Sequence, residues 1–437
     1  MGFTLKPVRV GICGLGTVGG GTFNVLQRNC DEITRRTGRA IVVEHIAQRR
    51  PNVNCDTGDT AITDDIFAVA NNPNVDVLVE LIGGHEPAKE LVLTAIRNGK
   101  HVVTANKALI AVHGNEIFEA ARKHNVVVAY EAAIAGGIPI VKALREGLAA
   151  NSINWLAGII NGTGNFILTE MRDKGRAFAD VLKEAQELGY AEADPTFDVE
   201  GIDAAHKLTI LSSVAFGIPL QFDQCYTEGI SKVSAEDVAN AESLGYRIKH
   251  LGLTRRTEAG IELRVHPTMI PEKRLIANVH GVMNAVLVEG NAVGPTMYYG
   301  AGAGAEPTAS AVVADLVDVV RDMAVNQNVR MPSLAFQQDA MSDTPILQMD
   351  KVITAFYMRM TVSDKPGVLA QITQILGDAG ISIEAIRQHT HVSSQVPVII
   401  LTRPVQEGHM NEAITAIEAL ADVNGEVTRI RVENLDG

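Results

Sequence analysis

Short apolar runs alternate with amphipathic segments along the first third of the chain. The apolar runs, which we interpret as strands, occupy residues 8–13, 40–47, 76–83, 100–106 and 125–133. Apolar residues recur at helical spacing in between, and predict helices at 87–98 and 115–123. Strands separated by helices of about ten residues predict a parallel, doubly wound α/β sheet, whose ligands bind beyond the carboxyl ends of the strands.

The pattern changes after residue 135. Helices predicted at 178–188, 199–216 and 235–244 are followed by strands, which indicates an α+β domain for substrate binding and dimerisation. Further on, little periodicity predicts a linker, and the last segment has the order β-α-β-β-α-β of a ferredoxin-like unit. We therefore expect three domains and one linker: a nucleotide domain (1–135, completed by a helix at 306–328), a substrate domain (136–305), a linker (329–350) and the ferredoxin-like domain (351–437).

The composition narrows the class of protein. A chain of 437 residues is too long for one ordinary core, and 46% hydrophobic with only 4% aromatic residues suits an α/β enzyme. The net charge of −13 argues against nucleic acid and anionic membranes as partners. Four scattered cysteines without a CxxC pair, and the lack of a long apolar segment, predict a cytoplasmic protein.

A glycine motif follows the first predicted strand. Gly14, Gly16 and Gly19 have G-x-G-x-x-G spacing, and an amphipathic helix begins directly afterwards. The first glycine permits a tight turn, the second lets a pyrophosphate approach the backbone, and the third lets the helix meet the strand. We therefore predict a Rossmann-type dinucleotide site with these loop contacts: Gly14, Leu15, Gly16, Thr17, Val18 and Gly19.

The end of the second predicted strand bears on the choice of cofactor. NAD enzymes usually carry an acidic residue there, which binds the ribose hydroxyls. Here the strand ends in Gln48-Arg49-Arg50, whose arginines can instead contact a 2′-phosphate, which favours NADP over NAD. Two solvated loop arginines are an almost equal alternative.

Other groups are expected at the carboxyl ends of the strands. Lys107 follows a strand end directly, so it should face the crevice, although an ordinary exposed lysine is the alternative. The loop 300–304 can approach the cofactor or simply cross between domains. Beyond the glycine motif, the predicted cofactor contacts are Arg49, Arg50, Gly83, Gly84, Thr104, Lys107, Gly304 and Glu306.

Acidic side chains are concentrated in residues 189–211. The segment 199–216 is predicted to be a helix with Asp198 as its N-cap, and Asp203 and Lys207 share one of its faces. An exposed ion pair of this kind contributes only about 0.3–0.5 kcal/mol. The apolar run after Lys207 favours a helix that enters the core instead. There a lysine needs a carboxylate partner and can exchange a proton with a substrate oxygen.

Two glycine-containing bends are weaker candidates. Carbonyls near Gly136, together with Glu131, can bind a small hard cation, although a hinge between domains is the preferred interpretation. Asn161, Gly162 and Thr163 place small polar groups at a strand end, where they can hold a polar substrate. A structural turn with Thr163 as a helix N-cap is an equal alternative.

The motifs resemble those of the homoserine dehydrogenases. They occur in the family's order: GLGTVG, TANKAL, EAAIAGGIP, GIINGTGNFIL, GYAEADPTFDVEGIDAAHKL and GAGAEPTASAVVAD. The resemblance implies reversible, NAD(P)-dependent oxidation of L-homoserine to L-aspartate 4-semialdehyde, in the biosynthesis of threonine, methionine and isoleucine.

The resemblance also implies residue roles. Lys207 matches the family's proton-transfer lysine, and Lys107 matches a second lysine near the nicotinamide and the substrate oxygen. Glu192 matches the acid that binds the substrate ammonium, and Asp203 matches another substrate-binding acid. The family's sodium site corresponds to Glu131 with the carbonyls of Ile134, Gly136 and Ile138. One departure is Phe197, which stands where some members carry an acid.

The segment DKPGVLAQITQILGDAGISI resembles the ACT domain, a regulatory module that binds amino acids at the loop before its first helix. The implied effector contacts are Asp364, Pro366, Gly367, Val368 and Ile381. ACT units usually pair edge to edge, which implies a homodimer or homotetramer. We expect feedback inhibition by L-threonine, with an oligomerisation module that binds no ligand as the alternative.

Two rival functions share parts of this pattern. Another amino-acid or hydroxy-acid dehydrogenase with an ACT tail leaves the acidic cluster around Glu192 without a role. A non-enzymatic, NADP-bound amino-acid sensor would bind cofactor without turnover, and the presence of both Lys107 and Lys207 argues against it.

Overall fold

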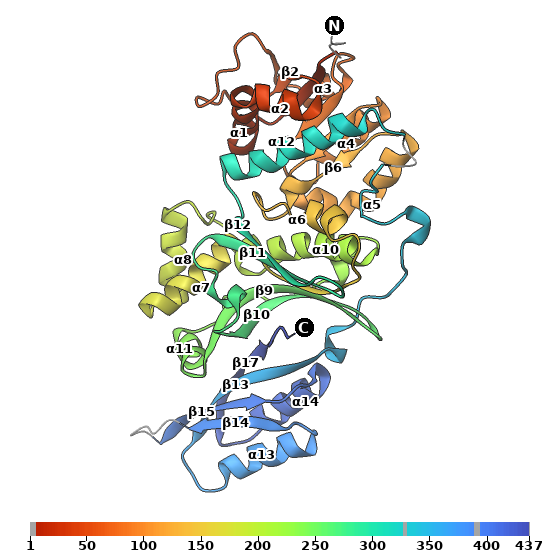
Figure 1. Ribbon diagram of the computed structural model, residues 1–437. Helices are drawn as coiled ribbons and strands as arrows, with labels where there is room; N and C mark the ends of the chain where they lie inside the picture. Colours follow the sequence, from red (N-terminus) through yellow and green to blue (C-terminus); the bar gives the residue numbers. More distant parts are fainter. Residues whose placement is uncertain (1–5, 327–329, 389–393, 437) are drawn as a thin grey trace. The chain divides into compact units, whose positions relative to one another are not determined.

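The computed structural model describes residues 6–326, 330–388 and 394–436 (Figure 1). The chain forms two compact units. The first comprises residues 1–162, 203–225 and 282–344, and the second comprises residues 163–202, 226–281 and 345–437. Among the helices of the described residues, none combines the length and apolar character that a membrane crossing requires.

A six-stranded parallel sheet opens the first unit, as the alternating pattern predicts. Its strand order, β3-β2-β1-β4-β5-β6, is that of a Rossmann fold. The strands are β1 (Val8–Cys13), β2 (Ile41–Ala47), β3 (Ala61–Thr63), β4 (Val77–Glu80), β5 (His101–Thr104) and β6 (Val128–Ala129). The strand predicted at 125–133 is wrong beyond Ala129, because the chain turns into a short 3-10 helix at Glu131–Ala133.

Helices connect and cover these strands. They are α1 (Thr17–Arg28), α2 (Cys30–Thr37), α3 (Ile66–Asn71), α4 (Ala88–Arg97), α5 (Lys107–Lys123) and α6 (Ile140–Lys142). Helix α4 matches its prediction. Helix α5 begins at Lys107 instead of residue 115, because the Asn106 side chain caps it by accepting a hydrogen bond from the Leu109 amide at 3.1 Å.

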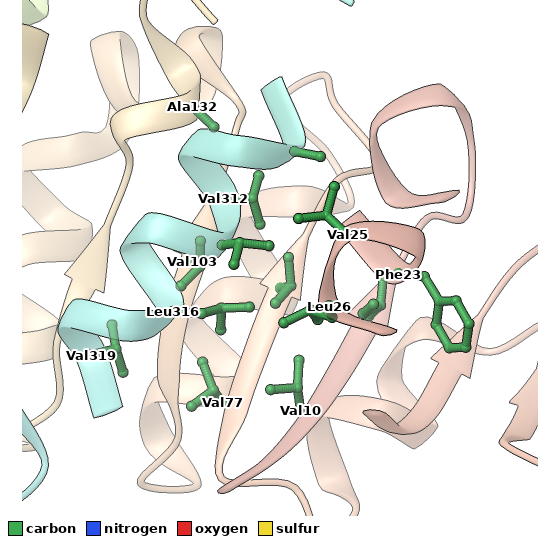
Figure 2. Packing of buried hydrophobic residues seen from close by; sticks show 14 of the residues in the cluster. Val10, Phe23, Val25, Leu26, Val77, Val103, Ala132, Val312, Leu316 and Val319 are labelled. Carbon is green, nitrogen blue, oxygen red and sulfur yellow. The ribbon is translucent and has the colours of Figure 1, made fainter. Parts of the chain in front are cut away.

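A helix from late in the chain completes this core. Helix α12 (Ala305–Asp322) packs against α1, as the predicted return of the chain requires, although it ends before residue 328. Figure 2 shows Val312 and Leu316 of α12 beside Leu26 of α1 and Val103 of β5. A side-chain carbon on Gly21 would lie 2.6 Å from the Ala305 carbonyl oxygen, so only glycine permits this close approach.

The helix that carries Lys207 differs from its prediction at the start. A single turn, α9 (Thr196–Val199), is separated from α10 (Ile202–Phe216) by Glu200 and Gly201, so Asp198 is not the N-cap of α10. Gly201 has φ +84°, which interrupts the helix. Every residue of α10 from Asp203 onwards is buried, so the apolar run indeed marks a helix inside the core.

Antiparallel strands occur in both units. In the first unit, β11 (Met283–Gly290) pairs with β7 (Ile153–Ile159) and with β12 (Gly294–Ala301). In the second, β9 (Tyr246–Thr257) and β10 (Gly260–Pro271) lie where strands were predicted and form a long hairpin, and the short strand β8 (Tyr226–Thr227) pairs with β10. The helices beside them are α7 (Gly162–Lys174), α8 (Phe178–Glu187) and α11 (Ala235–Ser243).

The C-terminal segment has the predicted β-α-β-β-α-β order, with a two-residue strand added. Its elements are β13 (Ile353–Ser363), α13 (Val368–Asp378), β14 (Ile383–Gln388), β15 (Gln395–Thr402), β16 (Val405–Gln406), α14 (Glu407–Glu418) and β17 (Val423–Val432). Strand β17 also pairs in parallel with β10, through Thr268 opposite Arg431 and Met269 opposite Val432. The segment therefore extends the β9–β10 hairpin within the second unit.

Two fully buried arginines reinforce this junction. Arg431 donates to Glu407 Oε2 and to Glu228 Oε2, both at 2.8 Å. Arg264 donates to Glu262 Oε2 at 2.7 Å and to Glu433 Oε1 at 2.5 Å. Breaking a buried pair by removing one partner costs roughly 3–5 kcal/mol. A truncation after residue 350 therefore destabilises the rest of the second unit as well as removing the tail.

Candidate active site

The glycine loop has the geometry of a dinucleotide site. Gly14 has φ +98°, and a side-chain carbon there would lie 2.6 Å from the Leu81 carbonyl oxygen. A side-chain carbon on Gly19 would collide with the Gly14 carbonyl, whereas one on Gly16 would meet no described atom within 4 Å beyond its chain neighbours. Gly16 is therefore open to a pyrophosphate at the start of α1.

A pocket of about 1340 Å³ extends from this loop. Of the expected cofactor contacts, its lining includes Gly14, Leu15, Gly16, Thr17, Arg49, Arg50, Gly83 and Glu306. The others lie outside the lining formed by the described residues: Val18, Gly19, Gly84, Thr104, Lys107 and Gly304. The two arginines after β2 thus lie in the same pocket as the glycine loop.

Asn52 connects these two parts of the pocket, and sequence reasoning missed it. Its Nδ2 donates to the carbonyls of Leu15 at 3.0 Å and Gly16 at 3.1 Å. Its Oδ1 accepts from the Asn54 amide at 3.0 Å. The loop that carries Arg49 and Arg50 is thereby held against the glycine loop, and an asparagine in a polar loop gives no signal of such a role.

Glu80 organises the next strand ends and was also missed. It is fully buried at the end of β4, and its Oε1 accepts from the amides of Ile82 at 2.9 Å and Gly83 at 3.0 Å. Thr104 Oγ1 donates to Glu80 Oε2 at 2.5 Å, so this hydroxyl supports the Gly83 turn. The only signal in the sequence is an acid in the middle of the apolar run VLVELIG.

Two lysines and one asparagine meet around the buried carboxylate of Asp203, which is 4% exposed. Its Oδ2 accepts from Lys207 Nζ at 2.7 Å and from Asn161 Nδ2 at 2.8 Å, and Lys107 Nζ lies 3.0 Å from Oδ1. Lys207 Nζ also donates to the Ile160 carbonyl at 2.7 Å. Lys107 keeps 34% of its side chain exposed, so it links the cluster to solvent.

The two lysines determine the charge of this cluster. Burial alone would raise the pKa of Asp203, but the ammonium groups of Lys207 and Lys107 and the hydrogen bonds from Lys207 and Asn161 hold it well below its usual value. Asp203 is therefore ionised at neutral pH. Two ammonium groups share one carboxylate, which suits the stabilisation of negative charge on a nearby oxygen.

Comparison with known proteins assigns the family. The family model described as the NAD-binding domain of homoserine dehydrogenase matches residues 14–131, the homoserine dehydrogenase model matches 139–317, and the ACT domain model matches 356–431. A homoserine dehydrogenase of Pseudomonas aeruginosa is 68% identical over 434 residues, covering 99% of this chain and 100% of the relative. The chain belongs to the homoserine dehydrogenase family. It is therefore an oxidoreductase that acts on a CH–OH group, with an NAD(P)-binding domain and an ACT domain.

Solved homoserine dehydrogenases share the fold. A crystal structure from Thiobacillus denitrificans has a TM-score of 0.95 at 63% identity and covers 99% of this chain and 100% of that one. A hyperthermophilic archaeal homoserine dehydrogenase in complex with NADPH has a TM-score of 0.62 at 27% identity, covering 72% of this chain and 97% of that one. The predicted fold class, with a parallel Rossmann-type sheet, a mixed-sheet substrate domain and a C-terminal ACT domain, is thus confirmed.

Three other predicted substrate residues of this homoserine dehydrogenase family member, Gly162, Thr163 and Glu192, differ from Asn161 and Asp203 in their contacts and exposure. Gly162 begins α7, where a side-chain carbon would lie 2.8 Å from the Val282 carbonyl oxygen. Thr163 lies inside α7 and is not its N-cap, and its hydroxyl donates to the Tyr190 carbonyl at 2.5 Å. Glu192 is exposed in the second unit. Their contacts with substrate stay predictions.

His206 is a neighbour of the charged cluster that the sequence reasoning did not use. Its ring stacks on Phe222 with 4.2 Å between centroids. Burial lowers the pKa of His206 to about 4, so the ring is neutral at physiological pH and adds no charge beside Lys107 and Lys207.

The bend after β6 contains Glu131, the carboxylate of the predicted cation site. The buried Glu131 carboxylate accepts from the amides of Val141 at 2.9 Å and Lys142 at 2.7 Å, and its own amide donates to Asp315 at 2.8 Å. Burial raises the pKa of Glu131 to about 7 and also raises that of Asp315. No group of three His, Cys, Asp or Glu side chains among the described residues is arranged to hold a metal, so backbone carbonyls would have to complete this site.

Replacing Asp203 tests the charged cluster. Asp203→Asn leaves two ammonium groups without their shared anion, so we expect kcat to fall by about 10²-fold or more and the free energy of unfolding to fall by roughly 3–5 kcal/mol. The value of kcat is measured from turnover with NADPH, and the free energy of unfolding is measured by chemical denaturation. The matched control is Glu119→Gln, which breaks an exposed i,i+4 pair with Lys123 and should change stability by less than about 1 kcal/mol. Equal behaviour of the two variants would contradict the proposed role of Asp203.

Proposed function

We propose that the enzyme catalyses the reversible NADPH-dependent reduction of L-aspartate 4-semialdehyde to L-homoserine, a step toward threonine, methionine and isoleucine. The observation that carries this proposal is the Lys207–Asp203–Lys107 cluster, which lies in the same unit as the glycine loop. A different amino-acid or hydroxy-acid dehydrogenase is disfavoured by the family assignment over nearly the whole chain.

Lys207 and Lys107 act on the substrate oxygen. A nicotinamide cofactor held at the glycine loop would supply a hydride to the aldehyde carbon, and negative charge would then develop on the adjacent oxygen. The ammonium groups of Lys207 and Lys107 stabilise this charge, and Lys207 donates the proton that completes the alcohol. Asp203 and the Ile160 carbonyl hold Lys207 in place, and the partly exposed Lys107 provides exchange of protons with solvent. In the oxidation direction Lys207 takes the proton back.

The amino-acid end of the substrate requires other groups. We assign the substrate ammonium to Glu192 and Asp203. We assign the polar groups next to it to Asn161, Gly162 and Thr163. This assignment is supported by the residue types and by the hydrogen bond from Asn161 to Asp203. The remaining oxygen of Asp203 is already close to Lys107, so the substrate ammonium would share that carboxylate with both lysines.

Arg49 and Arg50 support NADP as the preferred cofactor. Both line the nucleotide pocket, after a strand that ends without the acid expected of an NAD enzyme. Asn52 keeps their loop next to the glycine loop. The archaeal relative solved with NADPH is consistent with this preference.

The assay that tests this function follows nicotinamide absorbance during reduction of L-aspartate 4-semialdehyde. We expect turnover with both cofactors, a lower KM for NADPH than for NADH, and loss of that difference in Arg49→Ala/Arg50→Ala. The matched control is Arg35→Ala, an exposed arginine paired with Glu32 outside the lining of the nucleotide pocket, which should keep the preference. Turnover of other aldehydes in place of this one would refute the substrate assignment.

We further propose a sodium ion bound by Glu131 and the carbonyls of Ile134, Gly136 and Ile138. The raised pKa of Glu131 means that the folded protein holds a proton that the unfolded chain releases between pH 4.5 and about 7, so stability falls as the pH rises through that range. A cation favours the ionised carboxylate and opposes this loss.

A thermal melt tests the sodium proposal without measuring activity. We expect NaCl, compared with choline chloride at equal ionic strength, to raise the midpoint more at pH 8 than at pH 6. Glu131→Gln should remove the pH-dependent part. A sodium effect that is equal at both pH values, or unaltered in the variant, would count against the site.

We propose feedback inhibition by L-threonine through the ACT domain, acting at Asp364, Pro366, Gly367, Val368 and Ile381. Gly367 has φ +94° and leads directly into α13, which is the glycine-dependent turn that this loop requires. Exposed side chains along β14 favour pairing of ACT units in a homodimer or homotetramer. We expect L-threonine to lower the initial rate of the full-length enzyme. The full-length enzyme is used because truncation would also break the buried arginine pairs.

A further inference from the structure

A second pocket lies inside the second unit, within the junction that the buried arginines reinforce. Its volume is about 890 Å³, in the range of small-molecule sites. One wall is formed by α14 and β17, and the other by Glu200 and the loop 226–233. It shares no lining residue with the nucleotide pocket, and it excludes the ACT loop 363–368.

One wall of the pocket is fixed by hydrogen bonds. Glu228 Oε2 accepts from Arg431 at 2.8 Å and from the Tyr226 hydroxyl at 2.8 Å, and the Arg431 guanidinium lies 5.0 Å from the Tyr226 ring centroid. Arg431 is fully buried and also bound by Glu407. Since Glu228 and Arg431 are already paired with each other, a ligand meets a preformed wall and does not have to break their hydrogen bonds.

The remaining lining combines both signs of charge with apolar groups. Lys232 and Arg429 are cationic, and Arg429 also pairs with Glu407, whereas Glu200, Glu228 and Glu426 are anionic. Ile414 and Val427 belong to an apolar part of the lining, and the side chains of Ser231 and Thr415 add hydroxyls. A phosphate would face at least as much negative as positive charge. A molecule with one carboxylate, one ammonium and a short aliphatic side chain matches all three kinds of surface.

The pocket is also connected to the helix that carries Lys207. Ser231 Oγ donates to Glu200 Oε1 at 2.7 Å, and the Ile230 amide donates to the Val199 carbonyl at 2.8 Å. Gly201 follows with φ +84°, and α10 begins at the next residue. A ligand that moves Glu200 therefore acts on the residues immediately before α10 in the chain.

We propose that this pocket binds a small aliphatic α-amino acid as a zwitterion, at a site distinct from the ACT loop. We expect binding to be transmitted through Glu200, which lies two residues before α10 begins at Ile202. The binding claim does not depend on the proposed activity; only its effect on turnover does.

Calorimetric titration of the full-length protein tests the proposal, with L-threonine, L-isoleucine, L-methionine and L-alanine as probes. We expect at least one to bind wild type, and to bind at least about tenfold more weakly to Thr415→Trp, which fills the pocket from an exposed helix position. The matched control Ala416→Trp places the same ring on the next exposed residue of α14, outside the lining, and should keep both binding and basal turnover. Thermal melts verify that the variants fold, and Lys232→Glu provides a second, charge-reversing variant.

Each outcome decides the proposal. No binding of any probe to wild type overturns it, as does unchanged binding in both Thr415→Trp and Lys232→Glu. Binding that is lost in Asp364→Ala and kept in Thr415→Trp places the ligand at the ACT loop and also overturns it. Absence of homoserine dehydrogenase turnover with binding intact would refute the proposed function and leave the pocket standing.

Discussion

The buried carboxylate of Asp203 is the constraint on which the catalytic unit depends. A charge that is withdrawn from water needs partners, and Asp203 receives three: Lys207 on its own helix, Lys107 at the start of α5, and Asn161 after β7. These elements come from distant parts of the sequence. The ionic contact with Lys107 therefore fixes α10 against the strand ends, and Asp203 orients both lysines that we propose to act on the substrate oxygen.

Buried polar groups support this arrangement at neighbouring strand ends. Glu80 binds the amides of the Gly83 turn, and Asn106 donates to the Gly84 carbonyl at 2.7 Å while capping α5, the helix that begins with Lys107. Asn52 holds the glycine loop in a similar way, by donating to the carbonyls of Leu15 and Gly16. Each of these side chains makes two or more hydrogen bonds to backbone, which rigidifies a loop that must meet the cofactor.

Much of this was accessible from the sequence, because the glycine spacing, the alternation of strands and helices and the pairing of Asp203 with Lys207 follow simple periodic rules. The break between α9 and α10 at Glu200 and Gly201 could not be predicted from the sequence, because helices tolerate a single acidic residue or glycine within an apolar pattern. Asn52 and Glu80 were missed for other reasons: Asn52 binds backbone carbonyls far away in the chain, and Glu80 binds the backbone amides of the turn after its own strand. The pairs of Arg264 and Arg431 were hidden likewise, since arginine in an alternating strand normally predicts an exposed face.

The most direct test of the account is the turnover number of Lys207→Met for L-aspartate 4-semialdehyde with NADPH, measured together with NADPH binding by fluorescence. Methionine keeps the length of the side chain and removes its proton and charge. The account predicts a fall in kcat of about 10²- to 10⁴-fold with cofactor binding preserved, and near wild-type values for Lys123→Met, an exposed lysine in an i,i+4 pair. A kcat for Lys207→Met within a few-fold of wild type would contradict it.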